Sequence, residues 1–263
     1  MKIITFLTDF GTKSGYVAQM KGVISSLASD IKIVDITHEI TPQDINEGAF
    51  VLLTTVPYYP VGTVHLAVVD PGVGTDRKGI IITTKSQILI GPDNGLLIPA
   101  ARFLGDFTVY EITNKEYMLY SISNTFHGRD IFTPVAAHIL NGVPFEKIGN
   151  KTNKFINLDF GQGEVTDKSA VGKIIYIDGF GNIITNINAN KLRKFLKYDK
   201  KIKISIKGKQ QEIMFVKSYN FVKKGQLLAT IGSSNYLEIG VNQGNAAHKL
   251  GVKPEDKVTI VFN

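Results

Sequence analysis

One stretch of this sequence constrains its fold more than any other. It is an apolar, β-branched run over residues 63–69 that ends at an acid, Asp70. A run that is apolar at nearly every position is typical of a strand covered on both faces, as in a parallel α/β sheet. Ligands of such sheets gather at the carboxyl ends of the strands, where Asp70 stands. The following turn contains one proline and two glycines and ends at Arg77, so it can hold Asp70 and Arg77 close together. On this spacing alone, a structural salt bridge explains the pair as well as a catalytic turn does.

Strand and helix signals alternate through the first half of the chain. Besides the run before Asp70, strands are expected at Lys2–Leu7, Ile31–Ile36, Gly79–Thr84, Gln87–Ile90 and Phe107–Ile112. Helical spacing of apolar residues predicts helices at Tyr16–Leu27, Ile45–Thr55, Leu96–Leu104 and Phe132–Leu140, the second of them with Pro42 at its first position. This alternation predicts a three-layer α/β domain with a mostly parallel central sheet.

The second half of the chain has closely spaced strands and few helices. Strands are expected at Val171–Ile177, Asn182–Ile187, Lys201–Ile206, Glu212–Val216, Gln226–Ile231, Leu237–Val241 and Lys257–Phe262, and helices at Lys191–Leu196 and Ala246–Leu250. Such a pattern indicates a small antiparallel barrel or sandwich, and we expect a β-barrel. The polar segment Lys151–Lys168 shows no periodicity and is the expected boundary. The predicted domains are residues 1–155 and 156–263.

Composition narrows the class of protein. The chain has 263 residues, of which 43% are hydrophobic and 20% charged, as in a globular protein. Because cysteine is absent, thiolate nucleophiles, iron–sulfur clusters and cysteine-ligated zinc are excluded. No apolar run is long enough to span a membrane and the first residues do not resemble a signal peptide, so a cytoplasmic location is expected. The net charge of +7 comes from scattered lysines in the second half and predicts a solvated surface, with neither a nucleic-acid nor a membrane partner.

Several polar residues stand where chemistry is possible. Asp9 ends the first strand as Asp70 ends a later one, so it could accept hydrogen bonds from ribose hydroxyls or cap the next helix. His127 lies in the polar loop Thr125–Asp130 and could act as a base, an acid or a hydrogen-bond anchor, or simply be exposed. His38 and His248 have no cluster around them in the sequence.

Two loops of the second half suggest a binding role. In Asp178–Asn182, two glycines flank Phe180, which could stack on a ring while Asn182 reads a purine edge; a hairpin turn with a packed Phe is the alternative. The hydroxyl-rich turn from Gly232 to Glu238 could hold an ammonium or a carboxylate. No metal-site spacing, phosphate-binding loop or dinucleotide fingerprint is found, so neither a metal nor a cofactor is expected.

Taken in order, these loops resemble the S-adenosylmethionine (SAM) hydroxide adenosyltransferase family, the adenosine-forming SAM hydrolases related to fluorinase and chlorinase. The likeness extends over nearly the whole chain and is carried by Thr8–Gly11, Val17–Gly22, Val69–Gly74 with Arg77, Pro92–Gly95, Thr125–Asp130, Ile177–Asn186 and Tyr236–Ile239.

The resemblance implies a set of catalytic residues. The positions that match those around the attacking water are Asp70, Arg77 and His127. The halogenases have a Tyr in place of this Asp, and Tyr-Ser where this chain has His127–Gly128. Water is therefore the expected nucleophile rather than a halide. Because a cation lowers the pKa of a neighbouring carboxyl group, Asp70 paired with Arg77 is expected to be a weak base that shares the proton transfer with His127.

The resemblance also implies how the substrate is held. Asp9 would take the ribose hydroxyls, Asp178 and Ser233 the methionine ammonium, Asn182 the adenine edge, and Phe180 and Tyr219 the two adenine faces. Gln43 and Ser234 depart from the fluorinase, which has a Trp and an Arg there. The family further implies a homotrimer with its sites at subunit interfaces.

The predicted reaction is hydrolysis of SAM to adenosine and L-methionine by attack of water or hydroxide at ribose C5′. Two other classes remain open on the sequence. One is a metal-dependent nucleotide phosphohydrolase that uses Asp9, Asp70 and His127 as ligands. The other is a protein that binds an adenosyl ligand without turnover.

Overall fold

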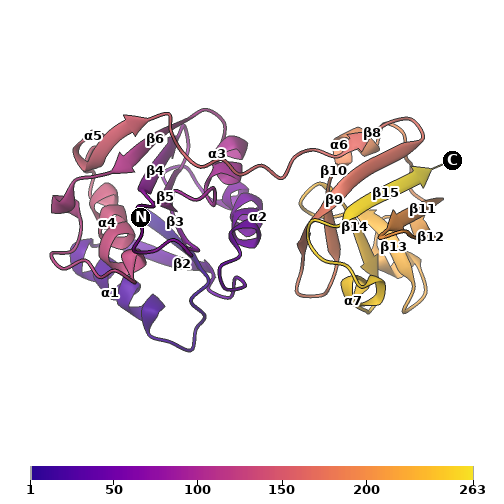
Figure 1. Ribbon diagram of the computed structural model, residues 1–263, viewed down its shortest axis with the longest axis horizontal. Helices are drawn as coiled ribbons and strands as arrows, with labels where there is room; N and C mark the ends of the chain where they lie inside the picture. The colour runs from indigo at the N-terminus through magenta and orange to yellow at the C-terminus, as the bar shows by residue number, and fades with distance from the viewer. Residues whose placement is uncertain (1, 263) are drawn as a thin grey trace. The chain divides into compact units, whose positions relative to one another are not determined.

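A computed structural model describes residues 2–262 and divides the chain into two compact units, one ending at Asp159 and the other beginning at Phe160 (Figure 1). The division falls within the polar segment Lys151–Lys168. The domain limits 1–155 and 156–263 remain a proposal. Among the described residues, no helix is both long and apolar enough to cross a membrane.

The first unit is built on a seven-stranded sheet with the strand order β2-β1-β3-β5-β4-β6-β7. Its strands are β1 (Lys2–Thr8), β2 (Ile31–Thr37), β3 (Val64–Val68), β4 (Gly79–Thr84), β5 (Ile88–Pro92), β6 (Phe107–Ile112) and β7 (Gly149–Thr152). The pairs β1–β2, β1–β3 and β3–β5 are parallel, and β5–β4, β4–β6 and β6–β7 are antiparallel. Hence all strands except β4 and β7 run in one direction, and the expected mostly parallel sheet is confirmed.

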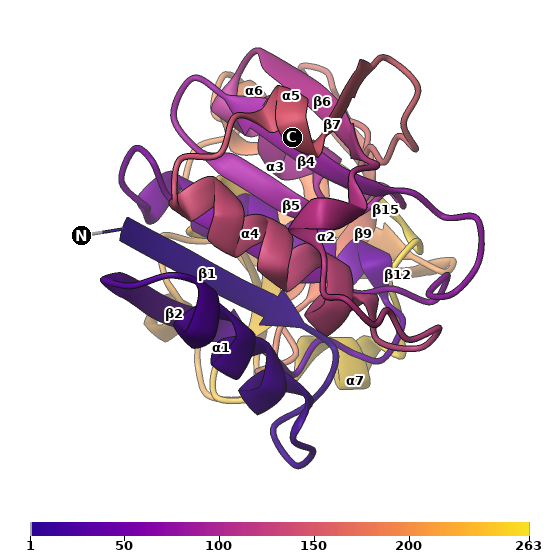
Figure 2. The same cartoon turned by 90° about the vertical axis from the view of Figure 1, so that its left-hand side faces the viewer.

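Helices cover both faces of this sheet, which makes three layers. Helices α1 and α4 pack on one face and α2 and α3 on the other (Figures 1 and 2). The helical segments are α1 (Tyr16–Leu27), α2 (Ile45–Thr55), the 3-10 turn η1 (Val56–Tyr58), α3 (Ile98–Leu104), the 3-10 turn η2 (Lys115–Tyr117), the π-helical turn η3 (Gly128–Phe132), α4 (Thr133–Leu140) and α5 (Phe145–Ile148). Apolar residues of α1, α4 and the sheet, such as Met20, Ile24 and Leu66, form a continuous core.

The start of α2 differs from the sequence prediction. The helix begins at Ile45, and the side chain of Asp44 caps it by accepting a hydrogen bond from Glu47 N. Pro42 therefore precedes the helix instead of occupying its first position. Gln43, between them, has a φ of +68°, and its backbone turns toward the end of β1.

The second unit is a closed β-barrel of seven strands with a short eighth strand at its edge. Neighbours follow the order β10-β14-β13-β12-β11-β15-β9-β8, and pairing of β9 with β10 closes the ring. Its strands are β8 (Glu164–Val165), β9 (Ser169–Ile177), β10 (Ile183–Asn188), β11 (Lys200–Ile206), β12 (Lys209–Phe215), β13 (Leu227–Ile231), β14 (Tyr236–Val241) and β15 (Lys257–Phe262). The expected barrel is confirmed, but β12 and β13 form a parallel pair within the otherwise antiparallel ring.

Short helical segments complete the barrel unit: α6 (Ala189–Leu192), the 3-10 turn η4 (Tyr219–Phe221) and α7 (Ala246–Leu250). Every second residue of β14, namely Leu237, Ile239 and Val241, belongs to the apolar core. Because side chains alternate along a strand, Glu238 and Gly240 lie on the opposite, outer face of the barrel wall.

Candidate active site

The sheet places two acids at the carboxyl ends of adjacent strands. Strands β1 and β3 are parallel, with Thr8 beside Val68, so the residues that follow them emerge at the same edge. There Asp9 and Asp70 line one cavity of about 370 Å³, together with Phe10, Tyr16, Gln43, Pro71 and Val73. The carboxylate of Asp9 accepts a hydrogen bond from Gln43 N at 2.8 Å.

Asp70 and Arg77 form a two-point ion pair. Arg77 Nε donates to Asp70 Oδ1 at 3.0 Å, and Nη2 donates to Oδ2 at 2.6 Å. The two side chains are only 5% and 8% exposed, and the guanidinium lies over the ring of Phe132, 5.2 Å from its centre. A forked, buried pair of this kind has a fixed geometry, unlike a surface salt bridge.

A glycine allows the Asp70–Arg77 turn to approach the loop that carries His127. Gly74 has a φ of +78°, and a Cβ there would collide with the backbone carbonyl oxygen of Asn124. Only glycine meets both conditions without strain. The close approach brings Arg77 Nη2 to 3.0 Å from His127 Nδ1.

This contact fixes the protonation of His127. A guanidinium can only donate, so Nδ1 accepts and the ring is neutral with its hydrogen on Nε2. Burial, and then the charge of Arg77, lower the pKa of His127, which agrees with a neutral ring.

The loop around His127 is anchored by Asp130, which is fully buried. Its carboxylate accepts hydrogen bonds from Ser123 N at 2.8 Å and from Arg129 Nε at 2.6 Å. His127 immediately precedes η3, the π-helical turn that continues into α4. Turns of this kind are rare and often occur at functional sites.

Asp70 is a stronger base than the sequence predicts. Burial raises the pKa of its carboxyl group, and this effect outweighs the opposing effects of Arg77 and His127. The expectation that Arg77 lowers the pKa of Asp70 overall is therefore wrong. The sequence shows the charge partner but not the loss of solvent around it.

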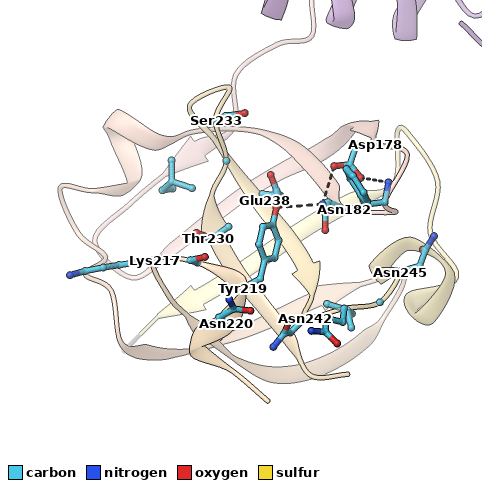
Figure 3. Close-up of a pocket in the computed structure, with 17 residues that line it drawn as sticks. Asp178, Asn182, Lys217, Tyr219, Asn220, Thr230, Ser233, Glu238, Asn242 and Asn245 are labelled. Carbon is cyan, nitrogen blue, oxygen red and sulfur yellow. Dashed lines mark hydrogen bonds between the residues drawn. The ribbon is translucent and has the colours of Figure 1, made fainter. Parts of the chain in front are cut away.

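The barrel carries a second cavity, of about 920 Å³, on its outer face. Five predicted binding residues line it, namely Asp178, Phe180, Asn182, Tyr219 and Ser233 (Figure 3). Phe180 is 80% exposed. An exposed aromatic ring beside a cavity offers a stacking surface, since a ring serving only the core would be covered.

Asp178 stabilises its own loop by accepting three hydrogen bonds. Its Oδ1 accepts hydrogen bonds from the backbone N of Phe180 and of Asn182, and its Oδ2 accepts from Asn182 Nδ2 at 2.9 Å. A carboxylate offers about four acceptor positions, so Asp178 retains room for one donor from a ligand.

Glu238 belongs to two of the motifs described above but has no predicted role. Its side chain lines the same cavity, is 7% exposed and accepts a hydrogen bond from the hydroxyl of Tyr219. Burial raises the pKa of Glu238 and also that of Tyr219. The available signal was the alternation along β14, which puts a carboxylate on the face opposite the core.

The predicted residues thus fall into two groups. Asp70, Arg77 and His127 are in contact, and Asp9 shares a cavity with Asp70. The remaining five residues line the barrel cavity. Within residues 2–262, no three His, Asp or Glu side chains lie close enough together to hold a metal ion.

Two other histidines are buried and have polar partners. His38 is not isolated as the sequence suggests, because its Nδ1 lies 2.9 Å from Thr8 Oγ1 and its Nε2 3.1 Å from Asp35 Oδ1. His65 is fully buried between Thr5 and Gln87. Both support the strands that end at the cavity of Asp9 and Asp70.

Comparison with known proteins gives consistent matches over both units. The family model described as the SAM hydroxide adenosyltransferase N-terminal domain matches residues 4–149, and that of the C-terminal domain matches residues 172–259. The (R)-S-adenosyl-L-methionine hydrolase of Methanocaldococcus jannaschii is 41% identical over 271 residues, which cover 100% of this chain and 97% of the relative.

Two further matches agree. The protein of the same name from Salinispora tropica is 36% identical over 260 residues, covering 98% of this chain and 97% of the relative. The crystal structure of an uncharacterized conserved protein from Thermotoga maritima superposes with a TM-score of 0.93 at 38% identity. That match covers 98% of this chain and 99% of the other.

Proposed function

The chain belongs to the SAM hydroxide adenosyltransferase family, and on that premise we propose that it hydrolyses SAM to adenosine and L-methionine. The observation that carries the proposal is the contact of Asp70, Arg77 and His127 at the carboxyl ends of the strands. It supplies a base of raised pKa, a fixed cation and a neutral imidazole in one place.

The substrate makes the bond cleavage favourable. The water oxygen attacks ribose C5′, the C5′–S bond breaks, and its electron pair stays on sulfur. The sulfonium thereby becomes the neutral thioether of methionine. No acid is needed for this leaving group, so the protein has to position the water and remove one proton.

We assign the removal of that proton to Asp70. Its raised pKa supports this role, because a carboxylate of ordinary pKa is a poor proton acceptor near neutral pH. His127 uses Nδ1 to accept from Arg77, which leaves Nε2–H to donate a hydrogen bond to the water oxygen. Arg77 holds Asp70 and His127 in place through the nitrogens of its guanidinium group.

The barrel cavity is the proposed adenosine and methionine site. Asn182 would contact adenine, Phe180 and Tyr219 its faces, and Asp178 and Ser233 the ammonium. Asp9 would bind the ribose hydroxyls from the other unit. Because these residues belong to both units, a homotrimer that combines them at subunit interfaces fits the proposal, and size-exclusion chromatography with light scattering would test it. A cytoplasmic location is proposed as well.

The direct test is incubation of the protein with SAM and chromatographic measurement of adenosine and methionine. Equal amounts of both products are expected, with no change on adding a chelator and no halogenated nucleoside with chloride or fluoride. His127→Ala should lower turnover by about a hundredfold. Lys85→Ala, which removes an exposed surface pair with Asp106, is the matched control and should leave turnover unchanged. Absence of adenosine would refute the proposed reaction.

A further inference from the structure

The amide of Asn182 has a defined direction. Its Nδ2 lies 2.9 Å from Asp178 Oδ2. A carboxylate can only accept a hydrogen bond, so the amide nitrogen, rather than the amide oxygen, faces Asp178. This contact uses the first of the two amide hydrogens.

The second amide hydrogen meets Tyr219. Asn182 Nδ2 lies 3.4 Å from Tyr219 Oη, and the Tyr219 hydroxyl donates to Glu238 Oε1. Because that donation uses the only hydrogen of the hydroxyl, Oη can meet Asn182 only as an acceptor. Figure 3 shows the resulting row of contacts from Glu238 through Tyr219 and Asn182 to Asp178. Asn182 Oδ1 is the polar atom of this amide that remains for a ligand.

Two glycines leave room for this row of side chains. A Cβ at Gly240 would lie 2.9 Å from Tyr219 Cε1 and 3.0 Å from Asn182 Oδ1, both too close. A Cβ at Gly232 would likewise crowd the carboxylate of Glu238. Asn182 and Glu238 are 6% and 7% exposed, so removing one member of the row would leave a buried polar group without its hydrogen-bond partner.

We propose that Glu238 and Tyr219 are positioning residues that leave Asn182 Oδ1 as an acceptor for a 6-amino group, so that the site selects adenosyl compounds over 6-oxopurine analogues. The proposal deepens the proposed function and rests on it, because it puts the purine against Asn182. A 6-amino group donates to Oδ1. A 6-oxo group presents a second acceptor to the same oxygen and is repelled.

The test compares the binding of adenosine and inosine to the full-length protein by calorimetry. Wild type should bind adenosine about tenfold or more tightly than inosine. Tyr219→Phe keeps the ring but frees one amide hydrogen, which can then donate to a 6-oxo group. The ratio of the two affinities should therefore fall about fivefold.

Substitutions at Glu238 separate positioning from simple loss of structure. Glu238→Gln keeps an oxygen that accepts from Tyr219 and should retain most of the selectivity, whereas Glu238→Ala should lose it. Tyr198→Phe is the matched control. It removes a hydroxyl from the same barrel, on a ring that stacks on Phe215 away from the cavity, and should leave the ratio unchanged.

Two results would overturn the inference. One is equal binding of adenosine and inosine by wild type. The other is a Tyr219→Phe variant that binds adenosine and inosine more weakly than wild type by the same factor. Adenosine release from SAM, measured in parallel, is the separate test of the proposed function. Turnover without nucleoside selectivity would reject the inference alone.

Discussion

The two candidate sites use carboxylates in opposite ways. In the N-terminal unit, Asp70 is buried against a guanidinium that holds both of its oxygens. In the barrel, Asp178 and Glu238 are held by backbone, amide and hydroxyl donors, and burial, together with the charge of Asp178, raises the pKa of Glu238. The first arrangement fixes a base beside a cation, and the second presents acceptors to a ligand. The difference predicts that chemistry and recognition can be damaged separately.

The largest expected effect is that of Asp70→Asn. This change keeps the shape of the side chain but removes the base, so turnover should fall by about a hundredfold or more. Binding of adenosine should stay unchanged, because the barrel cavity does not contain Asp70. Adenosine release and calorimetry with adenosine measure the two effects.

The pH profile is the internal control for this variant. Since the pKa of Asp70 is raised, kcat/KM of wild type should fall as pH drops through that pKa, when the carboxylate takes up a proton. The residual activity of Asp70→Asn should lack this acid limb. If the limb persists in the variant, another group is the base.

A second difference between the units concerns acid stability. His65 is a fully buried residue of β3 that contacts Thr5 of β1, and burial lowers its pKa to about 4. Its ordinary pKa of about 6.5 applies in the unfolded chain. The unfolded state therefore takes up a proton first as pH falls from about 6.5 to 4. The N-terminal unit should lose about 3 kcal/mol of stability over that window, with none of the loss above it.

Hydrogen exchange at pH 7 and pH 4.5 locates this loss. Protection in β1 and β3 should fall at the lower pH more than protection in the barrel, whose only histidine, His248, is exposed. In His65→Gln the acid sensitivity of β1 and β3 should decrease, with a remainder from His127 and His138, whose pKa values burial also lowers. Equal loss in both units would show that His65 does not control it.

A smaller loss of activity is expected for Arg77→Lys, which keeps the positive charge but loses the two-point geometry of the guanidinium group. Lysine cannot hold Asp70 at two points and His127 at a third, so kcat should fall about tenfold. Weaker pairing also raises the pKa of Asp70 further, which should move the acid limb to higher pH. A limb that moves to lower pH would contradict this account of the pair.

The sequence predicts local features of this molecule well and their mutual contacts less well. Asp70 and Arg77, which pair, stand only seven positions apart in one turn, and the barrel strands follow from alternation over short windows. The partnership of Glu238 with Tyr219 joins residues 19 apart whose meeting depends on the fold.

Burial and rare backbone geometry are two further features that the sequence does not reveal. The raised pKa of Asp70 depends on burial of its carboxyl group in the folded protein, which the residues of the turn alone do not show. The π-helical turn η3 covers Gly128–Phe132, most of which the sequence predicts as a polar loop, because no apolar periodicity marks it. Contacts between loops need the three-dimensional arrangement that no local pattern contains.

The smallest expected effect comes from Ser233→Ala in the barrel cavity. Ser233 contributes one neutral hydroxyl, so its loss should weaken SAM binding by only a few fold, about 1 kcal/mol. Adenosine, which lacks the ammonium, should bind as before, while kcat stays near that of wild type because Asp70, Arg77 and His127 are untouched. Calorimetry measures the affinity for adenosine, and steady-state kinetics measure KM for SAM and kcat. If Ser233→Ala weakened the binding of adenosine as much as that of SAM, Ser233 would contact the nucleoside part of the substrate. Recognition of the methionine ammonium would then depend on Asp178.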